Sequence, residues 1–200
     1  MTNSIYLISP QKINKYNFYK DLDKLLKTHK VKFFQLRLKK IPIAKLLKIS
    51  KKVGKIVKKN NVKFLINDNP SIAKIINADG CHVGQKDMSL INARKILGKN
   101  KIIGVTCHNS KKLASKAKKE GANYVAFGSF FKSSTKKTAF KANLELLRWA
   151  KKKINMPIVA IGGINNSNYN KIILNGADYI ACSNYIWKSP NPVSAIKKFK

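Results

Sequence analysis

Two aspartates stand out in a chain that has only eight acidic residues against 42 basic ones. Asp68 and Asp87 each follow a short apolar run. Two carboxylates on neighbouring loops suit Mg2+, which keeps several of its waters and is usually shared between one or two carboxylates and the phosphates of a substrate. Either aspartate alone is more typical of a cap on the next helix, so it is the pair that predicts a metal site.

A second set of polar side chains alternates along one apolar run. Gln35, Arg37 and Lys39 are two residues apart, so on a strand all three point to the same face. If that face is the interior of a barrel, the three polar groups are costly unless a ligand or an interior ion pair satisfies them, and the scarcity of acids disfavours the ion pair. Together with Lys136, these cations could neutralise a diphosphate as it leaves.

Two further segments suit a phosphate group. Gly162 and Gly163 follow an apolar run, and we expect bare backbone amides there at the start of a helix, although a tight turn is equally typical of such a pair. A hydroxyl cluster beside Lys136 adds donors, and it is also typical of an ordinary loop. The cluster consists of Ser133, Ser134 and Thr135.

The elements that must position these groups are strands alternating with helices. Short runs rich in β-branched and aromatic residues alternate with lysine-flanked helical patterns, which indicates repeated βα units. Eight units of about 25 residues predict an α/β fold, a single compact (β/α)8 TIM barrel with short loops that occupies residues 1–200 as one domain. The strands are expected at Ile5–Ser9, Lys32–Leu38, Lys63–Asp68, Gly80–Gly84, Lys101–Thr106, Tyr124–Ser129, Pro157–Gly163 and Tyr179–Ser183.

Three related segments support the repeat. Asn77–Gly80, Gly121–Tyr124 and Gly176–Tyr179 each lead out of a helical pattern into an apolar run, before the fourth, sixth and eighth strands. In this fold the functional groups lie at the carboxyl ends of the strands and in the loops that follow. Asp68, Asp87 and the other candidate groups all occupy such positions.

The net charge of +34 invites a nucleic-acid interpretation, which the pattern disfavours. Only three of the 42 basic residues are arginines, whereas specific recognition of phosphates and bases relies on the guanidinium. The lysines also recur at helical spacing opposite an apolar face, which predicts a solvated exterior and no specific nucleic-acid partner. That spacing is clearest at Lys45, Lys48, Lys52, Lys55 and Lys59.

The lengths of the apolar runs and the cysteine pattern predict a cytoplasmic protein. No apolar run approaches the roughly 18 to 20 residues of a membrane span, and the first residues do not resemble a signal peptide, so we expect no membrane partner. Three cysteines that lie far apart in apolar runs predict buried free thiols. They are Cys81, Cys107 and Cys182.

Six segments, taken in order, resemble the thiamine-phosphate synthase family, within a wider group that includes the thiazole tautomerases. They are Gln35–Lys39, Leu65–Asp68, Asp79–Asp87, Gly104–His108, Phe127–Lys136 and Val159–Ile164. The resemblance implies a transferase that condenses hydroxymethylpyrimidine diphosphate with hydroxyethylthiazole phosphate, giving thiamine phosphate and diphosphate with the help of Mg2+. These small molecules are then its partners, and a homodimer is left open.

The resemblance also implies roles for individual residues. The magnesium ligands are Asp68 and Asp87, and the catalytic cations are Arg37, Lys39 and Lys136. The pyrimidine diphosphate is held by Gln35, Leu36, Arg37, Leu38, Lys39, Asn67, Thr106 and Lys136. The thiazole phosphate is held by Ser133, Ser134, Thr135, Gly163, Ser183 and Asn184.

Some positions depart from the family pattern, and alternatives remain open. Leu38 stands where the family often has Glu, the family's proline before the hydroxyl cluster is missing, and the apolar-Ser pair after the last strand is replaced by Ser183 and Asn184. A thiazole tautomerase would need no magnesium diphosphate site and would give His108 a role. A basic nucleic-acid-associated protein on an inert barrel is the alternative from another class. In the synthase interpretation His82 and His108 are structural.

Overall fold

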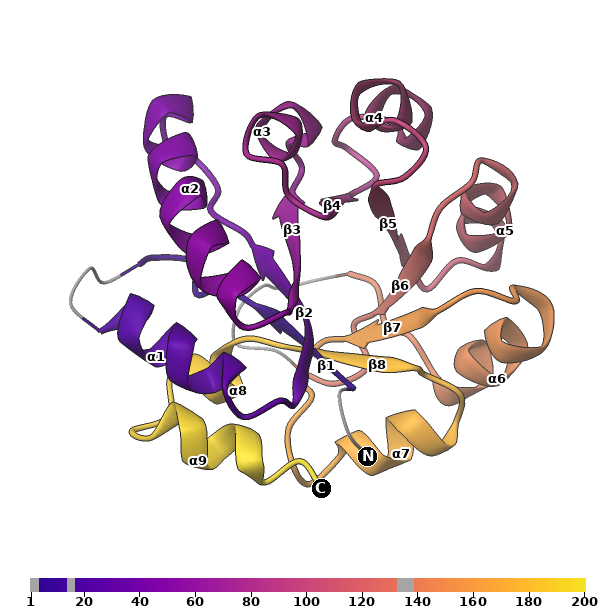
Figure 1. Ribbon diagram of the computed structural model, residues 1–200. Coiled ribbons are helices and arrows are strands. Elements are labelled where there is room, and N and C mark those ends of the chain that lie inside the picture. The colour runs from indigo at the N-terminus through magenta and orange to yellow at the C-terminus, as the bar shows by residue number, and fades with distance from the viewer. Residues whose placement is uncertain (1–3, 14–16, 133–138) are drawn as a thin grey trace.

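The computed structural model describes residues 4–13, 17–132 and 139–200 of the 200-residue chain. Eight parallel strands pair in chain order and close into a barrel, because β1 pairs with both β2 and β8. Helices surround the strands on the outside (Figure 1). The structure therefore confirms the predicted (β/α)8 barrel.

The strands lie close to their predicted positions. Strand β5 runs two residues further than expected, to His108, and β2 ends at Leu36, so that Arg37 and Lys39 lie just beyond it. The strands are β1 (Ile5–Ile8), β2 (Val31–Leu36), β3 (Lys63–Asn67), β4 (Gly80–Val83), β5 (Ile102–His108), β6 (Tyr124–Gly128), β7 (Ile158–Ile161) and β8 (Tyr179–Cys182).

The helices bury one face against the strands and expose lysines on the other. On α2, Leu46, Val53 and Val57 are buried while the lysines spaced three and four residues apart are exposed, as the pattern predicts. The helices are α1 (Phe18–Leu26), α2 (Ile43–Lys59), α3 (Pro70–Ile75), α4 (Leu90–Leu97), α5 (Lys111–Lys119), α6 (Leu144–Lys153), α7 (Tyr169–Leu174), α8 (Asn184–Trp187) and α9 (Pro192–Lys197). None of these described helices is long and apolar enough to cross a membrane.

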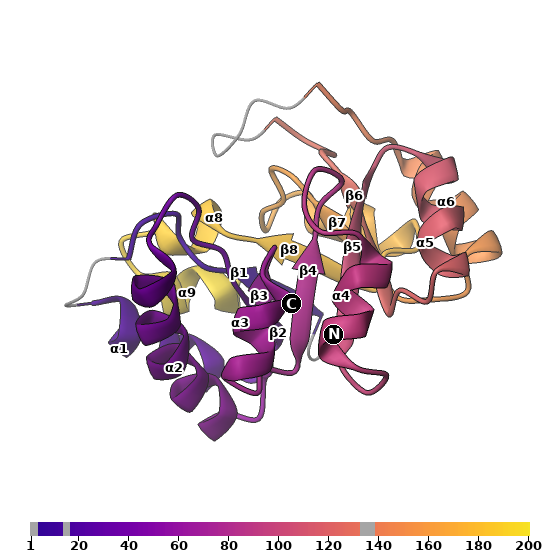
Figure 2. The same ribbon diagram turned by 90° about the horizontal axis from the view of Figure 1, so that it is seen from above.

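Two apolar cores hold the barrel together. The larger one fills the space between the strands and the helices, and it contains all three cysteines as buried free thiols, as expected. The smaller one fills the barrel interior, where Tyr6, Leu65 and Tyr124 pack together. Near the chain ends, α1, α8 and α9 lie side by side beside β1 and β8 (Figures 1 and 2).

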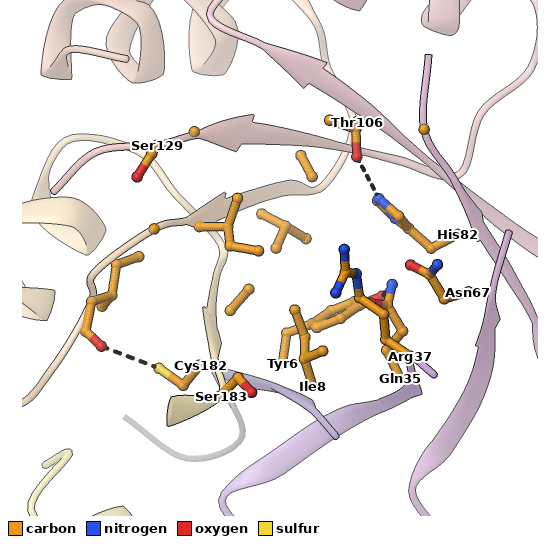
Figure 3. A pocket seen from close by; sticks show the side chains of 18 of the residues that line it. Tyr6, Ile8, Gln35, Arg37, Asn67, His82, Thr106, Ser129, Cys182 and Ser183 are labelled. Atoms are coloured by element: carbon orange, nitrogen blue, oxygen red, sulfur yellow. Dashed lines mark hydrogen bonds between the residues drawn. The ribbon is translucent and has the colours of Figure 1, made fainter. Parts of the chain in front are cut away.

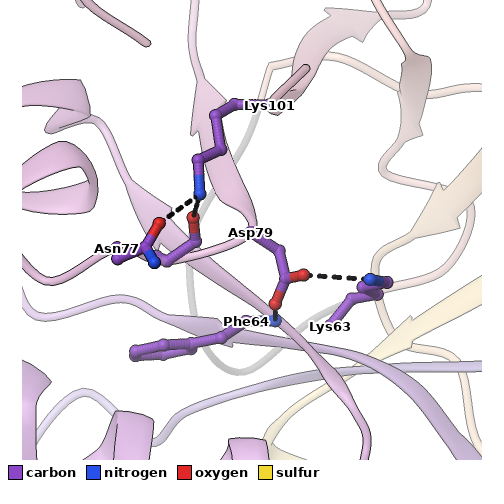
Figure 4. A network of polar contacts seen from close by, with 6 residues as sticks. Lys63, Phe64, Asn77, Asp79 and Lys101 are labelled. Carbon is purple, nitrogen blue, oxygen red and sulfur yellow. Dashed lines mark hydrogen bonds and ion pairs between the residues drawn. The ribbon is translucent and has the colours of Figure 1, made fainter.

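The amino-terminal end of the barrel is fastened by three clamps, which we define as Asp79, Asn123 and Asp178. The Asp79 carboxylate accepts a hydrogen bond from the Phe64 amide at 2.8 Å and pairs with Lys63 at 3.0 Å (Figure 4). Asp178 accepts one from the Ile158 amide at 2.9 Å and pairs with Lys151 at 2.7 Å. Asn123 accepts from the Ile103 amide at 2.8 Å and from Arg94 at 2.7 Å.

Each clamp is the third residue of one of the three related sequence segments. Each clamp precedes an even-numbered strand and binds the backbone at the start of the strand before it, β3, β5 or β7. Lys101 adds to this end by donating to Asn77 Oδ1 at 2.6 Å and to the Ala78 carbonyl at 2.8 Å (Figure 4). The internal repeat of the sequence is therefore a repeated backbone fastening.

Candidate active site

A cavity of about 960 Å3 opens at the carboxyl ends of the strands. Side chains from the strand ends and the following loops line it, among them Gln35, Arg37, Asn67, His82 and Thr106 (Figure 3). This is the end of the barrel at which enzymes of this fold carry their active sites. The candidate groups from distant parts of the sequence thus share one cavity.

The polar and apolar residues of segment 35–39 lie on opposite sides, as their alternation predicts. Gln35, Arg37 and Lys39 line the cavity, and Gln35 is only 2% exposed. Leu36 and Leu38 are not among the lining residues, because Leu36 is buried in the core between strands and helices and Leu38 packs against it. Any contact that these two leucines make with a ligand would therefore come from the backbone.

Arg37 differs from the other two arginines in its surroundings. Arg94 donates to Asn123 and to the backbone carbonyls of Gly98 and Lys101, and Arg148 donates to Asn175. Arg94 and Arg148 therefore bind other parts of the protein. Arg37 instead lines the cavity, where its charge would face a bound anion.

The acidic pair, Asp68 and Asp87, lies at the rim of the cavity. Lys39 forms an ion pair with Asp68 at 2.9 Å, and the Gly84 amide donates to Asp87 at 3.1 Å. Burial and the neighbouring Asp68 carboxylate raise the pKa of Asp87. The caps of the following helices are Asn69 and Ser89, so neither aspartate is the helix cap that its position also allowed.

The donor set at this rim fits a cation shared with a substrate. Across the described ranges, no group of three or more His, Cys, Asp or Glu side chains could hold a metal ion by itself. Two carboxylates with mutual repulsion suit a hard cation whose other ligands are water and phosphate oxygens. The positive charges of Arg37 and Lys39 lie on the same lining and suit the phosphates.

The floor of the cavity is a row of five hydrogen-bonded side chains in the barrel interior. Its members are Gln35, Tyr6, Tyr124, His82 and Thr106, and we call it the interior row. Burial and the charge of Arg37 lower the pKa of His82 to about 4, so its imidazole is neutral at physiological pH. Burial also raises the pKa of both tyrosines well above the usual range, so their hydroxyls stay protonated.

Tyr6 and Tyr124 are not among the candidate residues that the sequence motifs indicate. The signal available was their place in the alternation, because each tyrosine occupies an inward position of an otherwise apolar strand. A buried tyrosine hydroxyl requires a hydrogen-bond partner, so two of them in one barrel interior predict a polar contact there. Which residue each one meets depends on the register between strands that are far apart in sequence.

On the opposite side of the cavity, β7 leads into the predicted phosphate loop. Gly162 and Gly163 have φ angles of 109° and 63°, and a Cβ at either position would lie within 2.4 Å of an atom in the loop after β6. Phe131 N donates to the Gly162 carbonyl at 3.0 Å, which fastens the two loops together. The glycines are therefore required both by their φ angles and by this close approach.

The expected helix start at this loop was wrong. Helix α7 begins at Tyr169, six residues after Gly163, because the segment between them forms an Asn-rich turn in which Asn165 N donates to Asn168 Oδ1. Gly163 still lines the cavity. So do Ser183, which precedes α8, and Asn184, which begins it.

The remaining candidate residues lie partly in the cavity and partly outside the described residues. Asn67 and Thr106 line the cavity as expected. His108 also lines it and stacks on Phe140 with ring centroids 4.0 Å apart. The predicted hydroxyl cluster and the adjacent lysine lie outside the described residues; they are Ser133, Ser134, Thr135 and Lys136.

Comparisons with known proteins agree with this geometry. The sequence model of thiamine monophosphate synthase matches residues 5–186. The chain belongs to the thiamine monophosphate synthase family. A thiamine-phosphate synthase of Pelagibacter ubique strain HTCC1062 is 57% identical over 198 residues, which are 98% of this chain and 95% of that protein.

More distant members of the thiamine monophosphate synthase family match over the same length. The thiamine-phosphate synthase of Rhodospirillum centenum is 38% identical over 196 residues, which are 98% of this chain and 95% of that protein. The solved structure of a thiamine phosphate pyrophosphorylase from Pyrococcus furiosus has a TM-score of 0.87 at 27% identity, covering 98% of this chain and 93% of that one. The predicted family and its barrel are both confirmed.

Proposed function

We propose that the chain joins hydroxymethylpyrimidine diphosphate to hydroxyethylthiazole phosphate, forming thiamine phosphate and releasing diphosphate. The observation that carries this proposal is the acidic pair beside Arg37 and Lys39 on one wall of the cavity. A second anionic group would lie across the cavity at Gly163 and Ser183, which line it from β7 and β8. The cavity thus offers separate places for two phosphorylated reactants.

In the proposed reaction the bond between the pyrimidine methylene carbon and the diphosphate oxygen breaks. The diphosphate leaves with the electron pair, and Arg37 and Lys39 stabilise the charge that develops on its oxygens. The lone pair of the thiazole nitrogen then forms the new C–N bond to the methylene carbon. No proton has to be removed, so the residues act by orienting the two reactants and by electrostatics.

Asp68 and Asp87 are the residues that would hold Mg2+. Burial and the neighbouring Asp68 carboxylate raise the pKa of Asp87, and a bound cation would offset the negative charge of the pair, so these two residues fit the ion. When bound, the ion supplies positive charge that neutralises diphosphate oxygens. Lys39 already occupies part of this role through its ion pair with Asp68.

The test is an assay for thiamine phosphate with both substrates and Mg2+, applied to the parent protein, Asp87→Ala and Lys136→Ala. We expect activity in the parent and a loss of about 100-fold or more in kcat/KM in each variant, the size seen when a charge-stabilising group is removed. Lys112→Ala, on the exposed face of α5, is the matched control for the lysine and should keep full activity.

The outcomes separate the alternatives. Full activity in both Asp87→Ala and Lys136→Ala would contradict the site assignment. An inactive parent that exchanges protons on the thiazole would instead indicate a thiazole tautomerase. A nucleic-acid-associated protein would reveal itself by affinity that falls linearly and steeply with salt on a log-log plot.

A further inference from the structure

The interior row crosses the barrel from β2 to β5 beneath the cavity, and the proposed bond-making steps do not use it. Gln35 Nε2 lies 2.9 Å from the Tyr6 hydroxyl, which lies 2.7 Å from the Tyr124 hydroxyl. The Tyr124 hydroxyl lies 2.8 Å from His82 Nδ1, and His82 Nε2 lies 2.7 Å from Thr106 Oγ1. Figure 3 shows the His82 to Thr106 contact, with Gln35 and Tyr6 nearby.

The tyrosine at the centre of the interior row is tightly held. Its ring stacks on His82 with centroids 5.6 Å apart and meets Tyr6 edge to face at 5.8 Å. Gly104 makes room for it, because a Cβ at that position would lie 1.8 Å from Tyr124 Cζ. This packing holds the Tyr124 hydroxyl in a fixed position between Tyr6 and His82.

The direction of the first hydrogen bond fixes the direction of the others. Gln35 Nε2 can only donate, so the Tyr6 oxygen accepts, and the buried Tyr6 hydroxyl is left with the Tyr124 oxygen as the acceptor of its own proton. The Tyr124 oxygen accepts that proton and directs its own to His82 Nδ1. Each of the two tyrosine hydroxyls accepts once and donates once within the row.

His82 extends the same hydrogen-bond direction to Thr106. A neutral imidazole that accepts at Nδ1 carries its proton on Nε2, and this proton is donated to Thr106 Oγ1. The Thr106 hydroxyl then has its own hydrogen left for the cavity. At the opposite end, Gln35 has its carbonyl oxygen left, since its amide nitrogen is used by Tyr6.

We propose that the interior row presents an acceptor at Gln35 and a donor at Thr106, and so selects a heteroaromatic ring that carries an amine donor and a ring-nitrogen acceptor. Tyr124 and His82 are then positioning residues, because they act through the two residues that face the ligand. The inference rests on the proposed function, whose pyrimidine carries an amine and ring nitrogens. An oxo-pyrimidine, with oxygen in place of the amine, offers Gln35 an acceptor where the row requires a donor.

The first experiment measures the tautomer of His82 directly. Two-dimensional 15N NMR of the ligand-free, full-length protein at neutral pH should show His82 protonated on Nε2 and bare on Nδ1, with the signal assigned by its loss in His82→Gln. Protonation on Nδ1 would mean that the whole row runs in the reverse direction, and it would overturn the proposal. Protonation on both nitrogens would overturn it as well.

The second experiment interrupts the interior row at its centre. Tyr124→Phe keeps the ring and removes the hydroxyl. The hydrogen-bond direction at Gln35 then no longer determines the direction at Thr106. We expect the KM for the aminopyrimidine diphosphate to rise roughly tenfold while kcat and the KM for the thiazole phosphate stay within about twofold, as the loss of an oriented hydrogen bond predicts. The preference for the amino over the oxo ring should fall by a similar factor.

Tyr179→Phe is the matched control. Tyr179 also faces the barrel interior, where it packs edge to face on Phe33 with centroids 5.1 Å apart, and it is not a member of the interior row. This variant should leave both KM values and the ring preference unchanged. Equal effects of the two substitutions, or an unchanged ring preference in Tyr124→Phe, would show that Tyr124 is only a packing residue.

Failure of the inference and failure of the proposed function give different results. If the parent forms no thiamine phosphate, the proposed function fails, and the ring preference is then measured by calorimetry with the amino and oxo diphosphates. Tighter binding of the amino compound, reduced in Tyr124→Phe, supports the interior row in that case. Equal binding of the two compounds by the parent overturns the inference, whatever reaction the chain performs.

Discussion

The two ends of the barrel use the same residue type in opposite ways. At the amino-terminal end, Asp79 and Asp178 each bind a backbone amide and a lysine, so their charges are satisfied within the fold. At the carboxyl end, Asp68 and Asp87 are neighbours, and burial together with the Asp68 carboxylate raises the pKa of Asp87. The difference teaches that an aspartate bound by both a backbone amide and a lysine serves stability, whereas among the described residues Asp68 has only the lysine and Asp87 only the amide, which suits the cation site proposed for this pair.

The largest expected effect is on activity at the carboxyl end. Asp68→Asn keeps the shape of the side chain and removes the charge that would bind Mg2+ and pair with Lys39. We expect kcat/KM for thiamine phosphate formation to fall by about 100-fold to 1,000-fold, equivalent to roughly 3 to 4 kcal/mol of transition-state stabilisation. Steady-state kinetics at saturating Mg2+ measures this loss.

The same variant should leave the fold intact. Asp68 is not a helix cap and its ion-pair partner Lys39 is half exposed, so its loss costs little stability. The melting temperature should stay within about 2 °C of the parent. A large drop in melting temperature with retained activity would place Asp68 with the clamps and break the contrast between the two ends.

The second effect, on stability, is expected at the amino-terminal end. Asp178→Ala leaves the Ile158 amide without its acceptor and Lys151 without its partner. An unsatisfied backbone group costs about 2 kcal/mol, which corresponds to a fall of roughly 4 to 8 °C in melting temperature for a chain of this size. Differential scanning calorimetry measures the shift, and kcat/KM should stay within about twofold of the parent.

The sequence predicted the barrel well because the determining signals are local. Alternation of apolar residues places each strand, and the carboxyl ends of parallel strands meet at one end, so Arg37, Asp68 and Asp87 could be brought together without a structure. The three related segments could also be found in the sequence, but their role in binding the strand starts could not. The binding of Asp178 to the start of β7 depends on strand register, which no local pattern contains.

The parts that the sequence missed depend on contacts across the barrel. The interior row joins Gln35 to Tyr124 and His82, which are far apart in sequence and meet only when the barrel closes. The late start of α7 follows from side-chain turns of Asn165 and Asn168, which compete with the helix that the glycines suggested. Both are tertiary or turn effects that override the simple pattern.

The third expected effect is a pH dependence at the acidic pair. Because its pKa is raised, Asp87 takes up a proton at higher pH than an ordinary aspartate, so kcat/KM should fall earlier on acidification. Mg2+ competes with this proton, so a tenfold increase in Mg2+ should move the acidic limb down by up to about one pH unit. Profiles of kcat/KM at two Mg2+ concentrations measure the shift, and a limb that ignores Mg2+ would contradict the metal assignment.

The same shift acts on folding in the absence of metal. Since the folded pKa of Asp87 lies above its unfolded value, the folded state is favoured while Asp87 is protonated and loses this advantage as the pH rises through the folded pKa. Asp87→Asn should therefore be slightly more stable than the parent at neutral pH without Mg2+. Replacing Asp87 is thus expected to raise the melting temperature, whereas replacing the clamp Asp178 is expected to lower it.

The smallest expected effect is a gain at the third clamp. Asn123 occupies the position that is Asp in the other two clamps, and its Oδ1 receives both the Ile103 amide and Arg94. In Asn123→Asp both hydrogen bonds become charge-assisted, and exposure limits the gain to about 0.5 to 1 kcal/mol, or roughly 1 to 4 °C in melting temperature. The gain should shrink in high salt. An unchanged or lower melting temperature would show that the clamps work by backbone geometry alone, and that their charge matters only at the carboxyl end.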